Sequence, residues 1–442
     1  SPLLRRLYTP EDFGLLAVYG GLLALFTVVA SLRYELAIPL PECNAEAANV
    51  LILSLLVVCV MATVCGLMVF FIGEEIAIAL GAPQLAKFFW LLPIGVFLSG
   101  IYNVFNYWAI RTKTFGDIAK TQITQTLTTL SIQLLGYKFG GIALMFGQAG
   151  GQGMGSVRLA RSAFKHPEFN SWSWLGIWQA AKRYKQFPIF STWAAMFNTA
   201  GTQLPPLMFA ALFSAGAAGL YALANRILQL PMSVLGSAIG QVLFSGLAEA
   251  RQDGTMAKKI EHGSVTLLSL SLPAASVFMI FAPDLFGWIF GENWRSSGDV
   301  ARWMVPWIIF QFISSPLSVV YFVLEREKIG LYFQFFMFLF RSISILVGFV
   351  FFDFINTLII FSSVSAFCYF SYCISIFLIA DASPLFFIKG VVFNFLKIAI
   401  CLLPIVFILE WSLLLALIFS MLVLFILYWS SVREIIQSKK LV

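Results

Sequence analysis

The chain has 442 residues, of which 60% are hydrophobic, 16% aromatic and only 11% charged. Soluble domains are typically about 25% charged, so this composition excludes a soluble globular protein. The net charge of +7 does not indicate a nucleic-acid-binding surface, because the basic residues fall in short loops between apolar segments. The sequence is therefore that of a membrane protein.

Apolar runs of about twenty residues, the length that crosses a bilayer, recur along the chain. Together with the breakers between them, they predict about thirteen helical spans and an all-α polytopic membrane protein. The predicted spans are residues 12–38, 46–72, 84–110, 117–137, 140–160, 186–213, 216–248, 262–282, 300–324, 329–352, 355–380, 386–409 and 411–431. Residues 3–10 have the pattern of the end of a further helix, which would be a fourteenth span preceding the others.

Lysine and arginine are distributed unevenly between alternate loops. One set of loops holds most of them, including Arg111, Lys113, Lys182, Arg183 and Lys440, whereas the other set holds few. By the positive-inside rule, the first set and the C-terminus are predicted to be cytoplasmic.

The two halves of the chain resemble each other. Pro93 lies near the start of a span that ends at Arg111, and Pro306 precedes Arg326 by nearly the same interval. Parallel repeats of this kind are typical of transporters, which bind substrate between the two repeats. The repeat predicts four segments. They are an amino-terminal lobe at 1–160, a basic cytoplasmic linker at 161–185, a carboxy-terminal lobe at 186–380, and an appended helix pair with a cytoplasmic tail at 381–442.

The apolar segment 220–241 carries Asn225, Arg226 and Gln229 within two turns, followed by Pro231. An arginine near the centre of a membrane helix costs about 2.5–3.5 kcal/mol on insertion scales, so it is expected to face water, a partner or an anionic ligand. The proline removes a backbone hydrogen bond and predicts a kink. We predict a kinked, cationic helix lining a central cavity. The structural alternative is a hydrogen bond from Arg226 to carbonyls freed by the proline.

Other polar residues in the spans are weaker candidates. Arg341 is as deep in its span as Arg226. Arg33 lies near the inner end of its span beside Glu35, where an interfacial ion pair is the alternative to a gate. Asn103 and Gln125 are uncharged, and a hydrogen bond between helices is the default role of such groups. Collectively these amides also suit a cavity that binds sugars.

Three glycines, Gly147, Gly151 and Gly155, form a GxxxGxxxG pattern in an apolar span. Small residues at this spacing let two membrane helices approach closely. No strand precedes the pattern and no lysine follows it, so it does not predict a phosphate-binding loop.

Catalytic and metal-binding patterns are not found. The six cysteines form no C-x-x-C pair, and the two histidines, His166 and His262, lie beside neither a cysteine cluster nor a plausible nucleophile. Cysteines in apolar runs act as small hydrophobic residues. We expect no catalytic residue, no metal site, no disulfide framework and no cofactor, and we interpret the chain as a non-enzyme. Coupling to protons or sodium ions stays open.

Three stretches carry a resemblance to a known family. They are residues 7–14 (LYTPEDFG) together with 31–41 (SLRYELAIPLP), residues 221–236, and residues 290–294 (FGENW) through 315–318 (SPLS). They resemble the bacterial polysaccharide and O-antigen flippases of the multidrug/oligosaccharidyl-lipid/polysaccharide exporter superfamily. The resemblance covers essentially the whole chain.

The resemblance implies two pseudo-symmetric six-helix lobes in a V around a central cavity, working by alternating access. It implies transport of undecaprenyl-pyrophosphate-linked oligosaccharide, such as an O-antigen unit, across the bacterial inner membrane. The partners expected are this lipid-linked oligosaccharide, membrane lipids and other polysaccharide-assembly proteins, with no nucleic acid. A pyrophosphate needs cations and sugars need neutral hydrogen-bonding or stacking groups. The substrate-binding candidates are Arg226, Arg341, Arg33, Asn225, Gln229, Tyr221, Asn103 and Gln125.

Four alternatives remain open. A cation-coupled multidrug exporter of the same superfamily would be expected to carry acidic or aromatic cavity residues, whereas the deep charges here are arginines. A peptidoglycan-precursor flippase shares the requirement for cations. A membrane-embedded polysaccharide polymerase or ligase would be expected to have a larger outer loop than residues 283–300. A structural subunit leaves the deep arginines unexplained.

Overall fold

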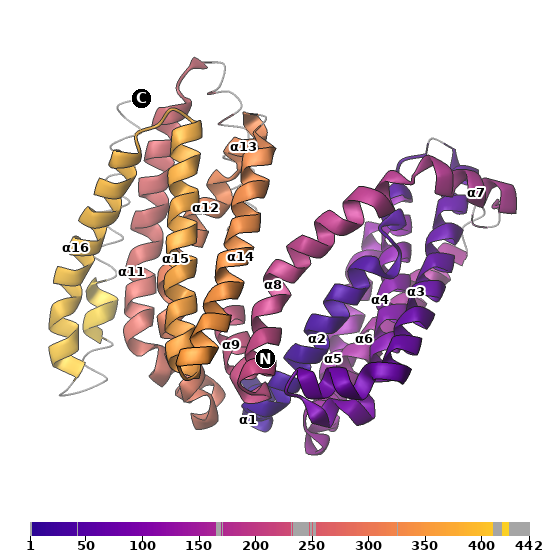
Figure 1. Cartoon of the computed structure of the whole chain (residues 1–442), viewed down its shortest axis with the longest axis horizontal. Coiled ribbons are helices and arrows are strands. Elements are labelled where there is room, and N and C mark those ends of the chain that lie inside the picture. The colour runs from indigo at the N-terminus through magenta and orange to yellow at the C-terminus, as the bar shows by residue number, and fades with distance from the viewer. Residues whose placement is uncertain are drawn as a thin grey trace. The chain divides into compact units, whose positions relative to one another are not determined.

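The computed structural model describes residues 2–41, 43–164, 169, 171–230, 232, 247, 250, 253–324, 326–409 and 418–423. All regular elements in these ranges are helical (Figure 1), which confirms the predicted all-α fold. Six helical stretches in this part of the chain are long and apolar enough to cross a membrane. They are Pro10–Ala30, Asn44–Ala79, Met256–Phe290, Glu292–Tyr321, Lys328–Phe351 and Phe354–Ile379. The chain is a multi-pass membrane protein.

The chain forms two compact units, Ser1–Ala222 and Leu223–Val442. The segment 161–185, predicted as the linker between lobes, therefore falls inside the first unit. The reason is that α8 (Thr192–Leu212), which follows this segment, packs along α2 (Pro10–Ala30). The unit boundary instead falls within α9 (Ala215–Leu228).

The first unit is a bundle in which α6 packs against both α4 and α5, and α3 packs against α4. Its elements, besides α2, α8 and the start of α9, are α1 (Pro2–Leu7), η1 (Tyr34–Ala37), α3 (Asn44–Ala79), η2 (Pro83–Phe88), α4 (Leu91–Arg111), α5 (Phe115–Leu135), η3 (Tyr137–Phe139), α6 (Gly141–Phe164), α7 (Trp174–Arg183) and η5 (Phe187–Ser191).

The start of α2 is defined by its sequence. Thr9 Oγ1 accepts a hydrogen bond from the Asp12 amide at 3.2 Å, and the Thr9 amide donates to Asp12 Oδ2 at 3.0 Å, which together form a capping box. Pro10 follows as the first helical residue, where its missing N–H costs nothing. Asp12 Oδ1 also accepts from the amide of Gly141 at 2.6 Å. One carboxylate thus both caps α2 and holds the start of α6 beside it.

The GxxxGxxxG pattern packs α6 closely against α5, as predicted. A Cβ on Gly151 would lie 2.0 Å from Thr129 Oγ1, and one on Gly155 would lie 2.1 Å from Gln125 Nε2. A larger residue at 151 would also meet the Gln125 carbonyl oxygen at 3.0 Å, whereas one at 155 would displace the Gln125 side chain.

The second unit has α12 (Arg295–Leu317) packed against both α11 (Met256–Phe290) and α15 (Phe354–Ile379). In turn α14 (Glu327–Phe351) packs on α15, and α16 (Pro384–Leu409) on α11 (Figure 1). The short elements are η7 (Glu292–Trp294) and α13 (Val319–Val323).

Most helix boundaries lie within a few residues of the predicted spans, but two helices are longer. In place of the spans 46–72 and 262–282, α3 continues to Ala79 past a kink at Ile72 (φ −131°, ψ 15°), and α11 runs from Met256 to Phe290. These extensions could not be predicted from the apolar runs, because each one continues beyond its run into charged residues. Pro231 and most of the predicted span 411–431 lie outside the described residues.

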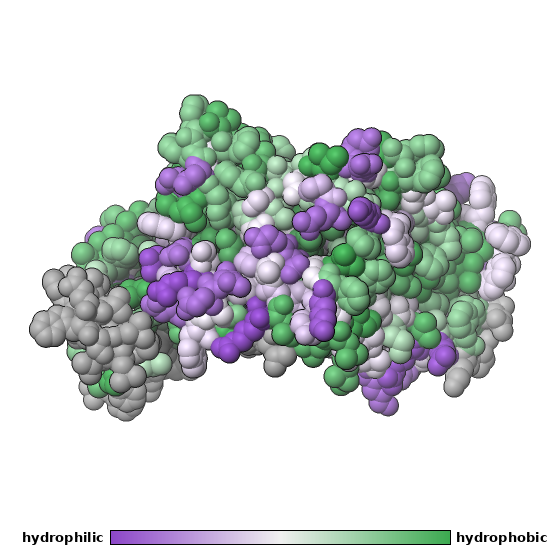
Figure 2. All heavy atoms as spheres, turned by 90° about the horizontal axis from the view of Figure 1, so that it is seen from below, coloured by the Kyte–Doolittle hydropathy of each residue, from purple (hydrophilic) through white to green (hydrophobic). Residues whose placement is uncertain are grey.

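Large apolar side chains are exposed along the helices. Phe70 is 80% exposed on α3, Val350 69% on α14 and Phe393 67% on α16. Figure 2 shows large hydrophobic areas on the molecular surface, interrupted by groups of hydrophilic side chains. Such surface is stable against lipid but not against water.

Candidate functional site

Arg226 lies in the last turn of α9 and its side chain is exposed. Within the described ranges, no hydrogen bond or ion pair engages its guanidinium. The predicted alternative, a bond to carbonyls freed by Pro231, falls outside those ranges. A guanidinium exposed on an otherwise apolar helix is available to an anion, for which it offers several donors in a fixed fork.

The neighbours of Arg226 have different environments. Gln229 Nε2 donates to Gln311 Oε1 on α12 at 2.9 Å, which uses that amide in a contact between helices. The Asn225 Oδ1 is buried and has no hydrogen-bond partner in the part of the chain that is described. Tyr221 is only 2% exposed, and its ring centroid lies 5.0 Å from that of Phe209. To stack on a sugar, Tyr221 would have to leave this contact.

Arg341 on α14 is held among aromatic rings. Its Nε donates to Ser365 Oγ on α15 at 3.0 Å. Its Cζ lies 5.1 Å from the ring centroid of Trp307, 4.9 Å from that of Phe361 and 5.9 Å from that of Tyr369. These are distances at which a ring face attracts a cation. We call Trp307, Phe361, Tyr369 and Ser365 the Arg341 cage.

The cage orients the Arg341 guanidinium while leaving most of its donors unused. A guanidinium has five N–H donors, and the described structure gives one hydrogen bond from this side chain. Trp307 and Tyr369 stack with their centroids 5.8 Å apart and an interplanar angle of 16°. The sequence analysis identified Arg341 but missed the three rings, because nearly every span contains aromatic residues.

Arg33 lies in a tight turn before η1, with φ +63° in the left-handed region. Its Nη1 is 3.8 Å from Glu35 Oε1, and Ser31 Oγ donates to the same carboxylate. Glu35 is only 3% exposed, so this is not the surface pair considered in the sequence analysis. Burial raises the pKa of Glu35, and the Ser31 hydrogen bond and the Arg33 charge oppose that rise only in part.

The amides predicted as sugar contacts lie on the central helices of the first unit. Asn103 is half-buried on α4, and Gln125 is half-buried on α5 against Gly155. Among the described residues, Gln125 Nε2, Asn106 Oδ1 and Gln152 Oε1 are buried polar atoms without a hydrogen-bond partner. Unsatisfied buried groups are costly, and water or a polar ligand would relieve that cost.

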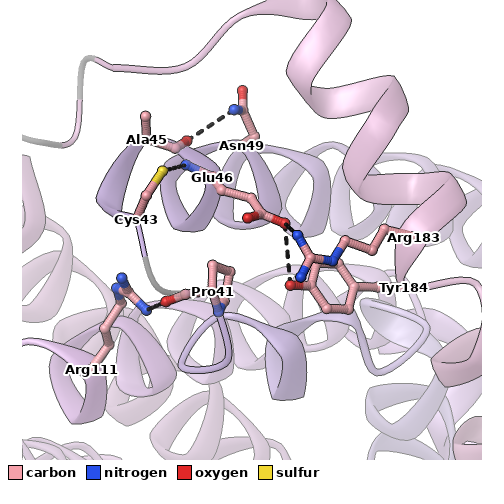
Figure 3. A network of polar contacts seen from close by, with 8 residues as sticks. All are labelled: Pro41, Cys43, Ala45, Glu46, Asn49, Arg111, Arg183 and Tyr184. Atoms are coloured by element: carbon pink, nitrogen blue, oxygen red, sulfur yellow. Dashed lines mark hydrogen bonds and ion pairs between the residues drawn. The ribbon is translucent and has the colours of Figure 1, made fainter.

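Arg111 has a local role that the sequence did not predict. Its Nη1 donates to the Pro41 carbonyl at 2.7 Å (Figure 3). Its Nη2 donates to Asn44 Oδ1 at 2.8 Å, so Arg111 holds the loop before α3 and the first residue of that helix. Close by, Glu46 pairs with Arg183 at the end of α7 at 2.7 Å. The first arginine of the predicted repeat therefore stabilises a loop.

Six apolar stretches of membrane length, together with an arginine on α9 that has no partner among the described residues and a ring-held arginine on α14, define a polytopic membrane protein with charged groups in its helices. Comparison with known proteins narrows this class. The chain belongs to the polysaccharide biosynthesis protein family, whose sequence model matches residues 3–299. This confirms the resemblance noted in the sequence. The chain is also 26% identical over 190 residues to the lipopolysaccharide biosynthesis protein WzxC of Escherichia coli strain K12. That match spans 39% of this chain and 38% of WzxC.

Two solved structures share the fold. One is titled lipid II flippase MurJ in an inward closed conformation, with a TM-score of 0.75, 14% identity, and coverage of 98% of this chain and 96% of that one. The other is an inward-facing multidrug resistance MATE family transporter of the MOP superfamily, with a TM-score of 0.66, 12% identity, and coverage of 90% and 95%. At these identities the likeness shows the fold alone. The expectation of a transporter rather than an enzyme agrees with the names of these proteins.

Proposed function

We propose that this chain translocates a polyprenyl-linked oligosaccharide, joined to undecaprenol through a pyrophosphate, across the bacterial inner membrane. Family membership and the flippase fold support translocation of a lipid-linked saccharide. The finer identity of the carrier rests on the chemistry of the site. Alternating access, a cytoplasmic C-terminus, and coupling to a proton or sodium ion belong to the same proposal.

The observation that carries the proposal is the exposed guanidinium of Arg226. It keeps its charge on an apolar helix without a counter-charge among the described residues. Placing such a charge in a membrane is costly, and binding a pyrophosphate offsets the cost through charge-assisted hydrogen bonds. A cationic drug would be repelled by the same residue, which favours an anionic substrate.

Two further features suit the remaining parts of that substrate. The Arg341 cage presents a second oriented guanidinium beside aromatic rings. Neutral amides with unused hydrogen-bonding atoms, Gln125 and Asn225, suit sugar hydroxyls, which require no charge. The prenyl tail needs no protein site because it can remain in lipid.

The test is leaflet translocation of a fluorescent lipid-pyrophosphate-oligosaccharide in proteoliposomes, comparing the wild type with Arg226→Ala and Arg226→Lys. We expect Arg226→Ala to lower the rate at least about tenfold, since a charged hydrogen bond contributes about 1.5–3 kcal/mol. Arg226→Lys should restore part of the rate because it keeps the charge and loses the fork.

Arg158→Ala is the matched control, because Arg158 is also exposed but donates to Thr124 Oγ1 at 2.9 Å. It should transport at the wild-type rate. Undiminished translocation by Arg226→Ala would contradict the anion-binding role. Equal loss with a glycolipid that lacks pyrophosphate would show that Arg226 acts on something other than the anion.

A further inference from the structure

The short helix α7 has one side fixed to the first unit. Ile177 and Ala180 are buried against the bundle. At the start of the helix, the Ser173 amide donates to Asn49 Oδ1 on α3 at 2.8 Å. A Cβ on Gly176 would lie 2.4 Å from Asn49 Nδ2, so a larger residue here would displace the Asn49 amide.

The end of α7 is fixed by polar contacts. Arg183 Nη1 lies 2.7 Å from Glu46 Oε1, and the Tyr184 hydroxyl donates to the same oxygen at 3.3 Å (Figure 3). The Tyr34 hydroxyl of η1 donates to the Ala181 carbonyl at 3.3 Å. Helix α7 is therefore a docked element of defined orientation.

The opposite side of α7 is apolar and exposed. Trp174 is 70% exposed, Leu175 68% and Trp178 63%. Lys182 Nζ lies 5.5 Å from the Trp178 ring, and Lys185 is exposed one turn further on. At about 100° per residue, Trp174, Trp178 and Lys182 fall along one stripe of α7, and Lys185 follows in the turn after the helix ends at Arg183. Two exposed tryptophans and a leucine on one ten-residue helix are costly in water.

Exposed apolar side chains also occur in the helical elements that follow α7 along the chain. Ile189 in η5 is 52% exposed, and Trp193 and Phe197 on α8 are 59% and 64% exposed, at intervals of four residues. Helix α8 contains no charged residue. The exposed apolar residues of α7 are thus followed along the chain by others on a helix that suits the membrane interior.

We propose that the outer face of α7 binds the anionic phospholipid surface of the membrane that the chain spans. The tryptophans enter the headgroup region, where their amphipathic rings are most stable. Lys182 and Lys185 contact lipid phosphates, as basic residues on interfacial amphipathic helices do. Arg183 takes no part, because Glu46 already neutralises it. A lipid surface fits better than a protein partner because α7 is followed along the chain by exposed apolar residues on an uncharged helix that suits the membrane interior.

Lipid bound at α7 would also affect the segment before α3, because α7 contacts it. The helix contacts η1 through Tyr34 and the start of α3 through Glu46, and η1 carries the Arg33–Glu35 pair. Anionic lipid would hold α7 and, through it, this turn in place. Neutral lipid would leave the turn held by protein contacts alone.

The test is amide hydrogen exchange of residues 171–186 in the full chain, in nanodiscs of phosphatidylcholine alone or mixed with phosphatidylglycerol. We expect exchange in the mixed discs to be slower by about fivefold for each engaged lysine, the factor that one basic residue contributes near an anionic surface. The double variant Lys182→Gln, Lys185→Gln should lose the dependence on phosphatidylglycerol. The double variant Trp174→Ser, Trp178→Ser should exchange faster in both kinds of disc.

Lys120→Gln and Trp288→Ser are matched controls, because both residues are exposed and lie outside α7. They should leave the exchange of α7 unchanged, and all variants should melt as the wild type does. Equal exchange in detergent and in both discs would overturn the proposal. Protection that depends on two copies of the protein in one disc, whatever the lipid, would overturn it in favour of self-association.

Discussion

Close glycine contacts occur in both units, since a Cβ on Gly298 of α12 would lie 2.4 Å from Pro283 Cα, but the stacked ring pairs of the described residues lie in the second unit. In the first unit, backbones approach closely at glycines, and a Cβ on Gly14 of α2 would lie 1.7 Å from the Ala215 carbonyl oxygen at the start of α9. In the second, rings stack between helices, as Tyr321 does on Tyr372 at 5.3 Å. Close backbone contact leaves no space for a long side chain. Ring packing leaves gaps between aromatic faces, and one of them holds the Arg341 guanidinium.

The largest effect is expected where a glycine meets backbone. Gly14→Ala places a methyl group against the Ala215 carbonyl, which cannot move without shifting a helix. We expect a loss of at least about 3 kcal/mol of stability. The measurement is the melting temperature and folded yield in detergent. Gly116→Ala is the control, because nothing lies within 4 Å of its added Cβ. It should be neutral or stabilising, and equal melting of both variants would contradict the packing argument.

The second unit is tested at two of its arginines, Arg341 and Arg226. Arg341→Ala removes a hydrogen bond to Ser365 and contacts with three rings, so we expect a loss of about 2–3 kcal/mol. Arg226→Ala should change stability by less than about 0.5 kcal/mol, because that exposed side chain has no partner within the described ranges. The measurement is the melting temperature of each variant, which reports these two losses of stability. Equal destabilisation would show that Arg226 has a structural role.

The difference between glycine contacts and ring packing also explains which features could be predicted from the sequence. Glycines at 147, 151 and 155 predicted close packing because their spacing allows few other roles. Helix positions followed from apolar runs. The Arg341 cage could not be predicted, because 46 Phe, 13 Tyr and 12 Trp leave too many equivalent ring pairs. Helix α7 lay in a segment predicted only as a basic linker, since its ten residues are too few for a span.

The turn before η1 is held by the buried Glu35 carboxylate, and not by a glycine contact or a stacked ring pair. We therefore expect the stability of the chain to depend on pH through this group. Because burial raises the pKa of Glu35, the folded chain keeps a proton that the unfolded chain has already lost. Stability should therefore fall as pH rises from the ordinary glutamate range through the raised pKa. Glu35→Gln should flatten this part of the melting profile, whereas Glu11→Gln, at an exposed position, should not. Parallel profiles for wild type and Glu35→Gln would contradict the assignment.

The smallest effect is expected at the polar end of α7. The Arg183 and Glu46 side chains are 64% and 27% exposed, so their 2.7 Å ion pair is expected to contribute no more than about 1 kcal/mol. A double-mutant cycle with Arg183→Gln and Glu46→Gln measures the coupling, which should weaken at high salt. Glu46→Gln should cost more than Arg183→Gln, because the Tyr184 hydroxyl also donates to Glu46. We expect the burial of Ile177 and Ala180 to be the main attachment of α7. A coupling energy above about 2 kcal/mol between Arg183 and Glu46 would contradict that expectation.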